Sequence, residues 1–556
     1  MKIIKIIITI LLSLLLAVLI LWGILHYLVW PAPELSELVP GKPLVYFAAS
    51  DLDKTVLAIQ ESDFLERFLR SPLWKEFKES RLGLQLIQQK SELDKQWYKH
   101  MGRQFDLMEV VGFVEKNSIL AFYAQQGRLD FLLLSEMGTL ARINLTSEST
   151  KKNLSSWYGY TMEKYNGTEL ITLEMDGWKF SYGIVDRAGM LSNDKALLKK
   201  AIDVYKGNRQ GLTASSGHNK LMAGMPESGI SFYANVARIM DSNRFFDVMS
   251  LHSGAVTGDL VSYLKSVAEP VDECAGAGFL QDGNLVFDTR MLHPSLSFQQ
   301  MGNTKTRFGS LAGGISAVPA NCLFFSLYET LDAHIPPEIL KTFVSLEPGA
   351  EMPILKNGAA AAILEPNVKE LQLIPPMMAF LRVKDRTNAE AAMKILKNSM
   401  RIGRRKLEFT ETEYENIPIS YTRIPIGMGM SIDAGYAFIG DDLLVVATDT
   451  SALEMVVDVS IGKRQSLMDD ESYASVLTPI AKDSDGRIFV NISAAAMMTK
   501  QAARLYSWRA KISGQQSAER ISTMLYENAF ILEAWRHMGT AFNSHGDMTN
   551  VKMILQ

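Results

Sequence analysis

The sequence predicts an α+β protein, built as two tandem, divergent repeats of a mainly antiparallel sheet with helices and preceded by one transmembrane helix. Two observations indicate the repeats. The segment Leu191–Leu212 recurs as Val446–Leu467 with a constant shift of 255 residues (449 − 194). The apolar stretch Val39–Asp53 recurs as Val318–Asp332 with a shift of 279 residues (318 − 39). Matches that follow in the same order indicate a duplicated unit. The third observation is a long apolar run at the N-terminus.

Each copy of the longer match has the pattern of a strand that runs into a capped helix. In the first copy, the side chain of Asp194 is suited to cap the helix N-terminus. Leu198, Ala201 and Ile202 follow at helical spacing, and Gly207 is suited to end the helix. The second copy has the equivalent residues Asp449, Leu453, Val456, Val457 and Gly462.

Two polar residues after this helix also recur. Arg209 and Gln210 are matched by Arg464 and Gln465. They form either a repeated contact site or part of the turn that follows each helix. Repeated polar residues usually serve repeated structure, so the turn is the favoured interpretation.

Both halves close with a pair of strands joined by a glycine-containing turn, Phe279–Leu292 and Phe542–Leu555, at a shift of 263 residues (542 − 279). We therefore expect a first repeat at residues 39–292 and a second at 318–556, with a linker at 293–317. A signal anchor at 1–30 and a tether at 31–38 precede them. The helical segment 62–103 has only a shorter counterpart in the second repeat, so it distinguishes the two halves.

The apolar run Ile6–Trp30 is about long enough as a helix to cross a hydrocarbon core of ~30 Å. Lys2 and Lys5 precede it, and no comparable basic cluster follows at once, so the N-terminus should stay cytoplasmic. A cleaved signal peptide is the alternative, but the run is longer than the usual apolar region of a signal peptide and no A-x-A-like site follows. We therefore expect a single pass through the inner (cytoplasmic) membrane, with the body in the periplasm or outside the cell.

Composition narrows the class of protein. The 556 residues are 47% hydrophobic and 21% charged, which is typical of a globular protein with room for two sizeable cores. The net charge of −4 gives no electrostatic case for nucleic acid. Two cysteines, Cys274 and Cys322, are too few for a Cys-rich zinc site. They either pair in an oxidising compartment or remain two buried thiols.

The motifs that could carry chemistry are incomplete. Ser-x-x-Lys, a serine acyl-transfer motif, occurs at Ser149–Lys152, Ser192–Lys195 and Ser262–Lys265, but its companion Lys-Thr-Gly is absent from the sequence. Glu533 and His537 have helical spacing but make at most half of a metal site. The acidic run Asp469–Glu471 has the pattern of a helix start. The sequence therefore predicts no catalytic, metal or cofactor-binding residues and no cofactor.

Taken together, the anchor, the tether, the Val-Pro strands, the Asp-capped helices and the closing glycine turns resemble a known kind of protein. They are similar to uncharacterised, N-terminally anchored exported proteins of bacteria, of the domain-of-unknown-function type. The resemblance implies a bacterial envelope protein and brings no catalytic residues with it.

The expected function is that of a membrane-anchored envelope protein whose non-catalytic, two-repeat exported body binds other envelope components, most simply proteins. The unmatched segment 62–103 would offer the docking face. One alternative is a module for a lipid or another hydrophobic ligand, because sheet-and-helix halves near a membrane can enclose an apolar site. A further alternative is a hydrolase whose active site follows no known motif.

Overall fold

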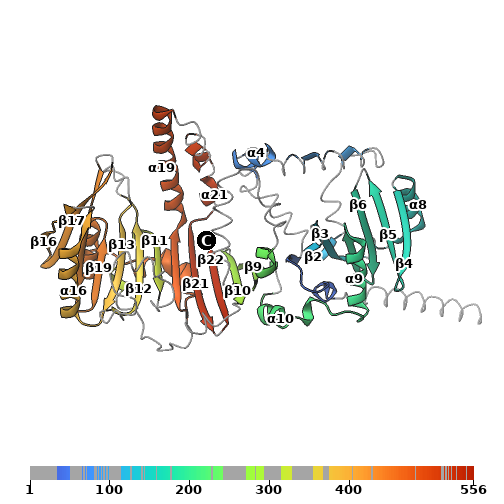
Figure 1. The fold of residues 1–556 in the computed structure, drawn as a ribbon, viewed down its shortest axis with the longest axis horizontal. Helices are drawn as coiled ribbons and strands as arrows, with labels where there is room; N and C mark the ends of the chain where they lie inside the picture. Colours follow the sequence, from blue (N-terminus) through green and yellow to red (C-terminus); the bar gives the residue numbers. More distant parts are fainter. Residues whose placement is uncertain are drawn as a thin grey trace, which may run out of the picture. The chain divides into compact units, whose positions relative to one another are not determined.

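The computed structural model describes residues 34–50, 114–241, 271–292, 315–328, 355–366 and 375–556, apart from short gaps within these ranges, and separate helical positions between 66 and 98. Its strands form one antiparallel sheet of 20 strands and a second sheet of two, β14 (Arg401–Ile402) and β15 (Arg405–Lys406) (Figure 1). The predicted fold class, two tandem, divergent repeats of a mainly antiparallel sheet with helices behind one transmembrane helix, is therefore wrong, because the strands of both predicted repeats belong to one sheet.

One pairing explains why a single sheet forms. β10 (Asn284–Leu292) and β22 (Met548–Leu555) are the last strands of the two predicted repeats, and they pair antiparallel along their length. An open strand edge presents a row of N–H and C=O groups that favours pairing with another edge. If the two predicted repeats formed independent sheets, β10 and β22 would each have an open edge. Their pairing joins these two edges.

Among the described residues, no helix is both long enough and apolar enough to span a membrane. α19 (Ile492–Ser513) has a suitable length of 22 residues, but it carries Lys500, Arg504, Arg509 and Lys511. The predicted span Ile6–Trp30 lies outside the described residues.

The chain divides into two compact units, Met1–Leu65 with Phe77–Ala277 and Glu66–Glu76 with Gly278–Gln556. α4 (Pro72–Glu79) and β9 (Glu273–Gln281) have residues in both. In the first unit the strands pair in the order β8–β1–β2–β3–β7–β6–β5–β4. They are β1 (Val45–Ser50), β2 (Val114–Gln125), β3 (Arg128–Met137), β4 (Gly159–Tyr165), β5 (Thr168–Met175), β6 (Trp178–Val185), β7 (Ala188–Ser192) and β8 (Ile230–Asn235). The helical elements are η1 (Leu35–Leu38), α8 (Glu148–Trp157), α9 (Lys195–Tyr205), η2 (Leu212–Ala214), α10 (Ser216–Met222) and α11 (Val236–Asp241).

In the second unit, the order β20–β11–β12–β13–β19–β18–β17–β16 corresponds to the first strand by strand, and β21 and β22 follow beside β20. These strands are β11 (Cys322–Tyr328), β12 (Leu355–Leu364), β13 (Met377–Val383), β16 (Thr410–Tyr414), β17 (Ile417–Gly427), β18 (Met430–Ile439), β19 (Leu443–Ala447), β20 (Gly486–Asn491), β21 (His537–His545) and β22. The helical elements are η4 (Ile315–Ala317), α16 (Arg386–Ser399), α17 (Thr450–Ser460), η7 (Leu467–Asp469), α18 (Glu471–Leu477), α19 and α21 (Phe530–Glu533).

The helices of the repeated segment, α9 and α17, begin and end as predicted. Asp194 accepts a hydrogen bond from the backbone N–H of Ala196 at 3.0 Å, and Asp449 accepts one from Ser451 at 2.8 Å. After the helices, Gly207 has φ of +73° and Gly462 has φ of +75°, which a residue without Cβ adopts at little cost. The helix bounds therefore follow from sequence-local chemistry.

Each unit is also closed by a backbone hydrogen bond between distant segments. The N–H of Leu212 donates to the carbonyl of Val39 at 2.9 Å, and the N–H of Leu467 donates to the carbonyl of Val318 at 2.7 Å. These bonds place the turn after each repeated helix against the segment that precedes the first strand of the same unit.

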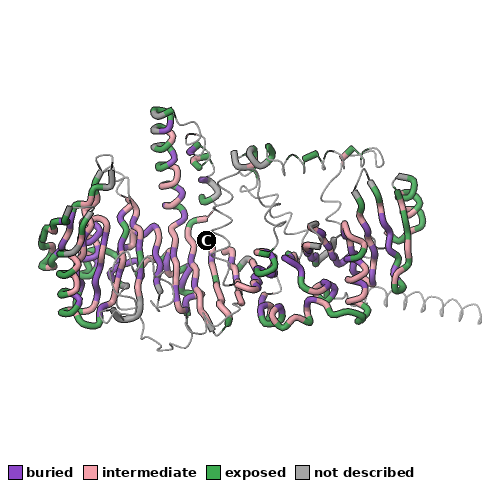
Figure 2. Tube along the Cα trace, in the orientation of Figure 1, coloured by how far each residue is buried: buried purple, intermediate pink, exposed green. Residues whose placement is uncertain are grey.

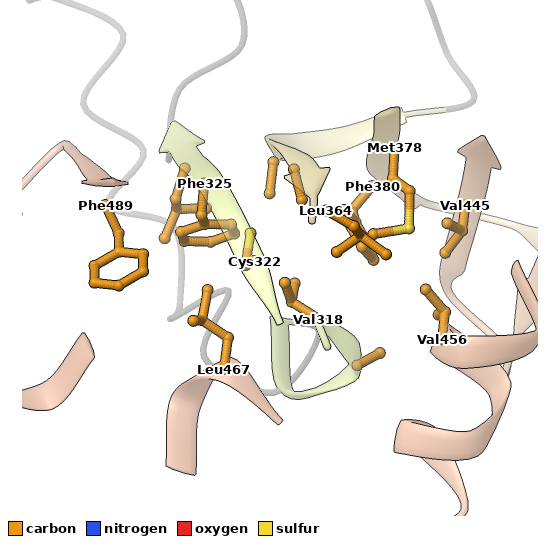
Figure 3. Packing of buried hydrophobic residues seen from close by; sticks show 14 of the residues in the cluster. Val318, Cys322, Phe325, Leu364, Met378, Phe380, Val445, Val456, Leu467 and Phe489 are labelled. Atoms are coloured by element: carbon orange, nitrogen blue, oxygen red, sulfur yellow. The ribbon is translucent and has the colours of Figure 1, made fainter. Parts of the chain in front are cut away.

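The core of the second unit lies between its sheet and α17 and α18. Phe325, Val456 and Leu467 are fully buried there, beside Val318 and Leu364 (Figure 3). Along the strands of both units, buried positions alternate with more exposed ones (Figure 2). This alternation is expected where one face of an antiparallel sheet packs on a core.

Candidate functional site

A pocket of about 280 Å³ lies in the first unit. Its lining includes four cationic side chains and no carboxylate: Lys42, Lys200, Arg209 and Arg238. We refer to it as the cationic pocket. Leu44 and Leu197, which are almost fully buried, contribute apolar lining. The pocket therefore combines a buried apolar part with cationic groups, three of which are exposed to solvent.

Separate elements bring these cations together. Lys42 lies just before β1, Lys200 lies on α9, and Arg238 lies on α11. Arg209 follows Gly207, whose left-handed conformation ends α9 and turns the chain back toward the segment at Val39. The hydrogen bond between Leu212 and Val39 thus positions Arg209 next to the Pro40–Lys42 stretch.

Two of the cations are fixed by their neighbours. The Nζ of Lys42 lies 2.5 Å from an oxygen of Glu273, whose side chain is only 9% exposed. Asn235 also donates to Glu273, at 3.5 Å. The guanidinium of Arg238 donates to the backbone carbonyl of Lys42 at 2.5 Å. Such charge-assisted contacts hold these two cations in place. Lys200 takes part in a further interaction of its own.

Tyr123, on β2, also lines the pocket. Its side chain is 7% exposed, and its hydroxyl has no hydrogen-bond partner among the described residues. Burial raises the pKa of Tyr123, and the nearby charge of Arg238 opposes this only in part. The hydroxyl therefore stays protonated at neutral pH. A buried polar group without a partner is uncommon and marks a place where a further polar group is expected.

The second unit offers a comparison for this pocket, because the same backbone pairings identify equivalent positions. Val45 pairs with Phe122 as Phe324 pairs with Ile363, so Tyr123 corresponds to Leu364. The carboxamide of Asn235 caps Arg238 as that of Asn491 caps Ala494. The shift of 279 residues matches Lys42 with Asn321 (321 − 42), and the shift of 255 residues matches Lys200 with Met455 (455 − 200). The equivalents of Lys42, Tyr123, Lys200, Arg209 and Arg238 are Asn321, Leu364, Met455, Arg464 and Ala494.

Only Arg209 keeps its charge at the equivalent position. In addition, Ala124 of the cationic pocket corresponds to Glu365. The shared fold therefore accounts for neither Tyr123 nor the other three cations. Sequence reasoning identified Arg209 and missed these four residues. The differences between Lys42 and Asn321 and between Lys200 and Met455 were already visible in the two ungapped matches. The difference at Tyr123 required the strand register, and that at Arg238 required the equivalent helix caps.

A second polar cluster lies in the core of the first unit. The hydroxyl of Tyr46 and Nε2 of His218 are 3.2 Å apart, and the ring of Tyr46 stacks on that of Tyr233 at 5.7 Å. Burial lowers the pKa of His218, against smaller opposing effects of Asn219 and nearby carboxylates. Burial also raises the pKa of Tyr46 to about 12. The imidazole is therefore neutral at physiological pH, and the cluster has the character of packed core.

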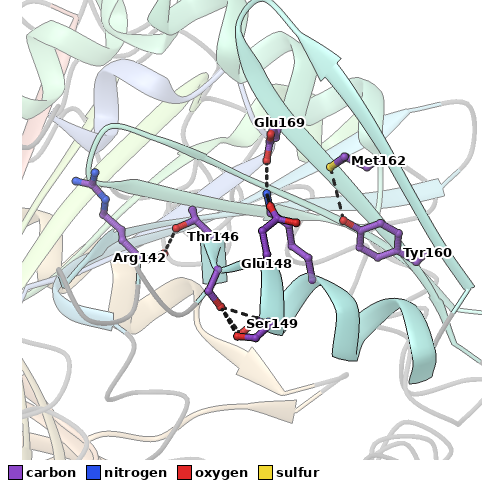
Figure 4. A network of polar contacts seen from close by, with 10 residues as sticks. Arg142, Thr146, Glu148, Ser149, Tyr160, Met162 and Glu169 are labelled. Atoms are coloured by element: carbon purple, nitrogen blue, oxygen red, sulfur yellow. Dashed lines mark hydrogen bonds and ion pairs between the residues drawn. The ribbon is translucent and has the colours of Figure 1, made fainter.

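The Ser-x-x-Lys motifs do not form a catalytic pair where the structure describes them. On α8, Ser149 shares a hydrogen bond with Ser147 at 3.1 Å (Figure 4), and Lys152, the lysine of this motif, is exposed to solvent. In the second motif, Ser192 donates to the carbonyl of Phe131, and Lys195 lies 3.1 Å from Glu163. The third, Ser262–Lys265, lies outside the described residues.

The remaining sequence candidates occupy structural positions. Glu533 ends α21 and contacts Lys500, whereas His537 begins β21, so the two do not share a helix. Asp470 caps α18 through the N–H groups of Ser472 and Tyr473. Within the described part of the chain, no three His, Cys, Asp or Glu side chains are grouped as a metal site would require.

Both cysteines are free thiols; Cys322 is buried, and Cys274 is only partly buried. Burial raises the pKa of Cys274 to about 11 and that of Cys322 to about 12. Neither thiol is therefore activated as a nucleophile.

The fold and the pocket define a sheet protein with a pocket lined by cationic side chains. Comparison with known proteins adds a family of unknown function. A family model described as "Protein of unknown function (DUF3352)" matches residues 353–523, which lie in the second unit. The predicted similarity to a domain-of-unknown-function family is confirmed to this extent. No curated protein matches.

Three solved structures, all of TP0453, are similar to parts of the chain. Crystal form III has a TM-score of 0.24 and 9% identity, and the match covers 48% of this chain and 84% of that one. Crystal form I gives 0.25 and 9%, with 48% and 82% covered. Crystal form IV gives 0.26 and 11%, with 50% and 87% covered.

Proposed function

We propose that this protein is a single-pass, membrane-anchored envelope protein whose exported body binds another envelope protein without catalysing a reaction. The location is supported by the apolar run Ile6–Trp30 and the preceding Lys2 and Lys5, on the same argument from length and charge as above. The binding role is supported by the surface of the helical segment 62–103.

The observation that carries the binding role is an exposed apolar stripe on this segment. Leu84, Ile87 and Tyr98 are helical, and they are 56%, 45% and 61% exposed. Leu84 and Ile87 are three residues apart, the spacing of neighbours on one helix face, and Tyr98 lies further along the same segment. Large apolar side chains that gather on one exposed face are typical of protein interaction sites. Leu84, Ile87 and Tyr98 are called the exposed stripe below.

The stripe has the chemistry of a helix face that docks in an apolar groove of a partner protein. In this recognition mode, apolar anchors one and several turns apart enter the groove and polar neighbours remain at its rim. Gln88 and Lys95 are exposed on the same helical segment and provide such neighbours. Because the second repeat has only a shorter counterpart of this segment, the docking face belongs to one half of the chain.

The docking role predicts a loss of function when the stripe is made polar. The double variant Leu84→Gln/Ile87→Gln should fail to complement a deletion strain while keeping the wild-type unfolding transition, because both residues are already exposed. The matched control Lys75→Ala/Lys78→Ala changes two exposed polar residues of α4, within the same segment, and keeps the stripe and its polar neighbours, so it should complement fully. His537→Ala should also complement if no catalysis depends on it. Full complementation by the double variant would contradict the docking role.

The location predicts the result of a topology experiment. A reporter that is active only in the cytoplasm should be silent when fused after Gln556, because the body would lie beyond the membrane. The same reporter fused before Met1 should be active and serves as the control. Strong activity of the C-terminal fusion would overturn the envelope location.

A further inference from the structure

We propose that the cationic pocket of the first unit binds a phosphate monoester group, carried either by a small molecule or by a lipid headgroup. This inference goes beyond the proposed docking function, because it concerns a different surface and a different ligand. It rests on the pocket's charge, its donor groups, its size and the comparison with the second unit.

The lining of the cationic pocket is rich in positive charge and in hydrogen-bond donors. Lys42, Lys200, Arg209 and Arg238 contribute four positive charges to the lining, and Lys42 is paired with a buried acid, Glu273. Lysine and arginine side chains are donors without acceptor capacity. A phosphate monoester carries about −1.5 to −2 charges at neutral pH and three acceptor oxygens. The lining therefore suits a compact dianion better than a neutral or cationic ligand.

Tyr123 adds a neutral hydrogen-bond donor to the lining of the pocket. Its buried hydroxyl lacks a partner among the described residues, and its raised pKa keeps the proton in place, so it can donate a hydrogen bond to an anionic oxygen. Arg238 lies close enough for its charge to act on this hydroxyl. Asp130, which lies opposite Tyr123 in the β2–β3 register, accepts a hydrogen bond from Asn193 at 3.3 Å and has a further interaction. A phosphate oxygen would supply the acceptor that the Tyr123 hydroxyl lacks.

The volume of the cationic pocket limits the size of the ligand. The volume of about 280 Å³ corresponds to roughly nine water molecules at ~30 Å³ each. A bare phosphate ion would leave part of this space unfilled. Leu44 and Leu197 provide apolar surface for the carbon skeleton of an ester. The pocket thus fits an organic phosphate rather than an inorganic ion alone.

The second unit has a different set of side chains at the positions equivalent to the cationic pocket. At the equivalent positions of the second unit, three cations are replaced by Asn321, Met455 and Ala494, and an alanine is replaced by Glu365. Shared backbone structure does not demand the cations, since the second unit forms the same strand order without them. The three cations are therefore not needed for the fold of the first unit. Binding of an anion explains why the first unit has them.

The test is a calorimetric titration of the full-length protein in detergent micelles. The probes are glycerol 3-phosphate and dihexanoyl phosphatidic acid, with glycerol and dihexanoyl phosphatidylcholine as controls that lack the phosphate monoester. We expect wild-type protein to bind at least one of the two phosphate probes and neither control. Binding of glycerol 3-phosphate identifies a small-molecule ester as sufficient, and binding of the phosphatidic acid alone identifies a lipid headgroup.

Variants make the test specific for the pocket. Arg209→Ala should weaken binding about tenfold or more, as expected when a charge-assisted contact is lost. The matched control Arg464→Ala, at the equivalent exposed position of the second unit, should leave affinity unchanged. Tyr123→Phe removes only the hydroxyl and should weaken binding without lowering the unfolding midpoint.

Absence of binding for both phosphate probes would overturn the proposal. Equal losses in Arg209→Ala and Arg464→Ala would also overturn it, because they would show general charge attraction. Neither result bears on the exposed stripe, which is tested by complementation.

Discussion

Replacing Leu198 or Leu453 with alanine is expected to lower the free energy of unfolding by about 2–5 kcal/mol in each case. Both side chains are 0% exposed and lie on the buried faces of α9 and α17. Removing them deletes buried methyl groups and leaves a cavity that the surrounding side chains fill only in part. Urea unfolding of the two single variants, followed by circular dichroism, measures the change.

Ile461→Ala provides the control. Ile461 follows α17 directly and is 44% exposed, so its truncation should cost clearly less than that of Leu453. If the unfolding midpoint of either leucine variant stayed at the wild-type value, that leucine would not act as a core residue. The equivalence of the two helices would then lose its physical basis.

Gly539→Ala is expected to destabilise the second unit by about 1–3 kcal/mol, the range for overpacking a close contact. A Cβ at this position would lie 2.6 Å from the backbone oxygen of Val476 and 2.8 Å from its carbonyl carbon. Val476 belongs to α18, which packs on β21. Because the obstructing atoms are backbone, a side-chain rotation does not relieve the contact, and α18 must shift.

Thr540→Ala is the matched control for this substitution. Thr540 is the next residue of β21, so its side chain points to the opposite face of the sheet. Its truncation should cost less than about 1 kcal/mol, the span of strand propensities. Thermal unfolding of both variants compares them directly. Equal stability of Gly539→Ala and wild type would show that α18 does not lie as close to β21 as the structure places it.

The sequence was most informative where structure is determined by neighbouring residues. Asp194 and Asp449 cap helices, and Gly207 and Gly462 end them, because these effects act within one helical turn. The joining of strands into one sheet was missed. The β10–β22 pairing links residues that are far apart in the chain, and neither strand carries a local signal for its partner.

The residues of the cationic pocket also differ in how well the sequence predicted them. Arg209 was found because it recurs at a fixed shift. Tyr123 and Arg238 reach the pocket only through the pairing of β1 with β2 and β8, which is not encoded in local spacing. The serine and lysine motifs had the correct spacing, but Ser149 bonds to Ser147, Ser192 bonds to a backbone carbonyl, and Lys195 pairs with Glu163.

The hydrogen bond between Leu212 and Val39 has a consequence for how the chain folds during synthesis. It closes a loop of 173 residues (212 − 39), and its counterpart between Leu467 and Val318 closes one of 149 (467 − 318). β1 pairs with β8, which the ribosome makes only after 179 further residues (230 − 51) have been added. Contacts between such distant residues form slowly, since the entropy of a long loop must be lost before they stabilise the chain. One edge of β1 therefore stays open while most of the first unit is being made, and an open strand edge is a site at which nascent chains aggregate.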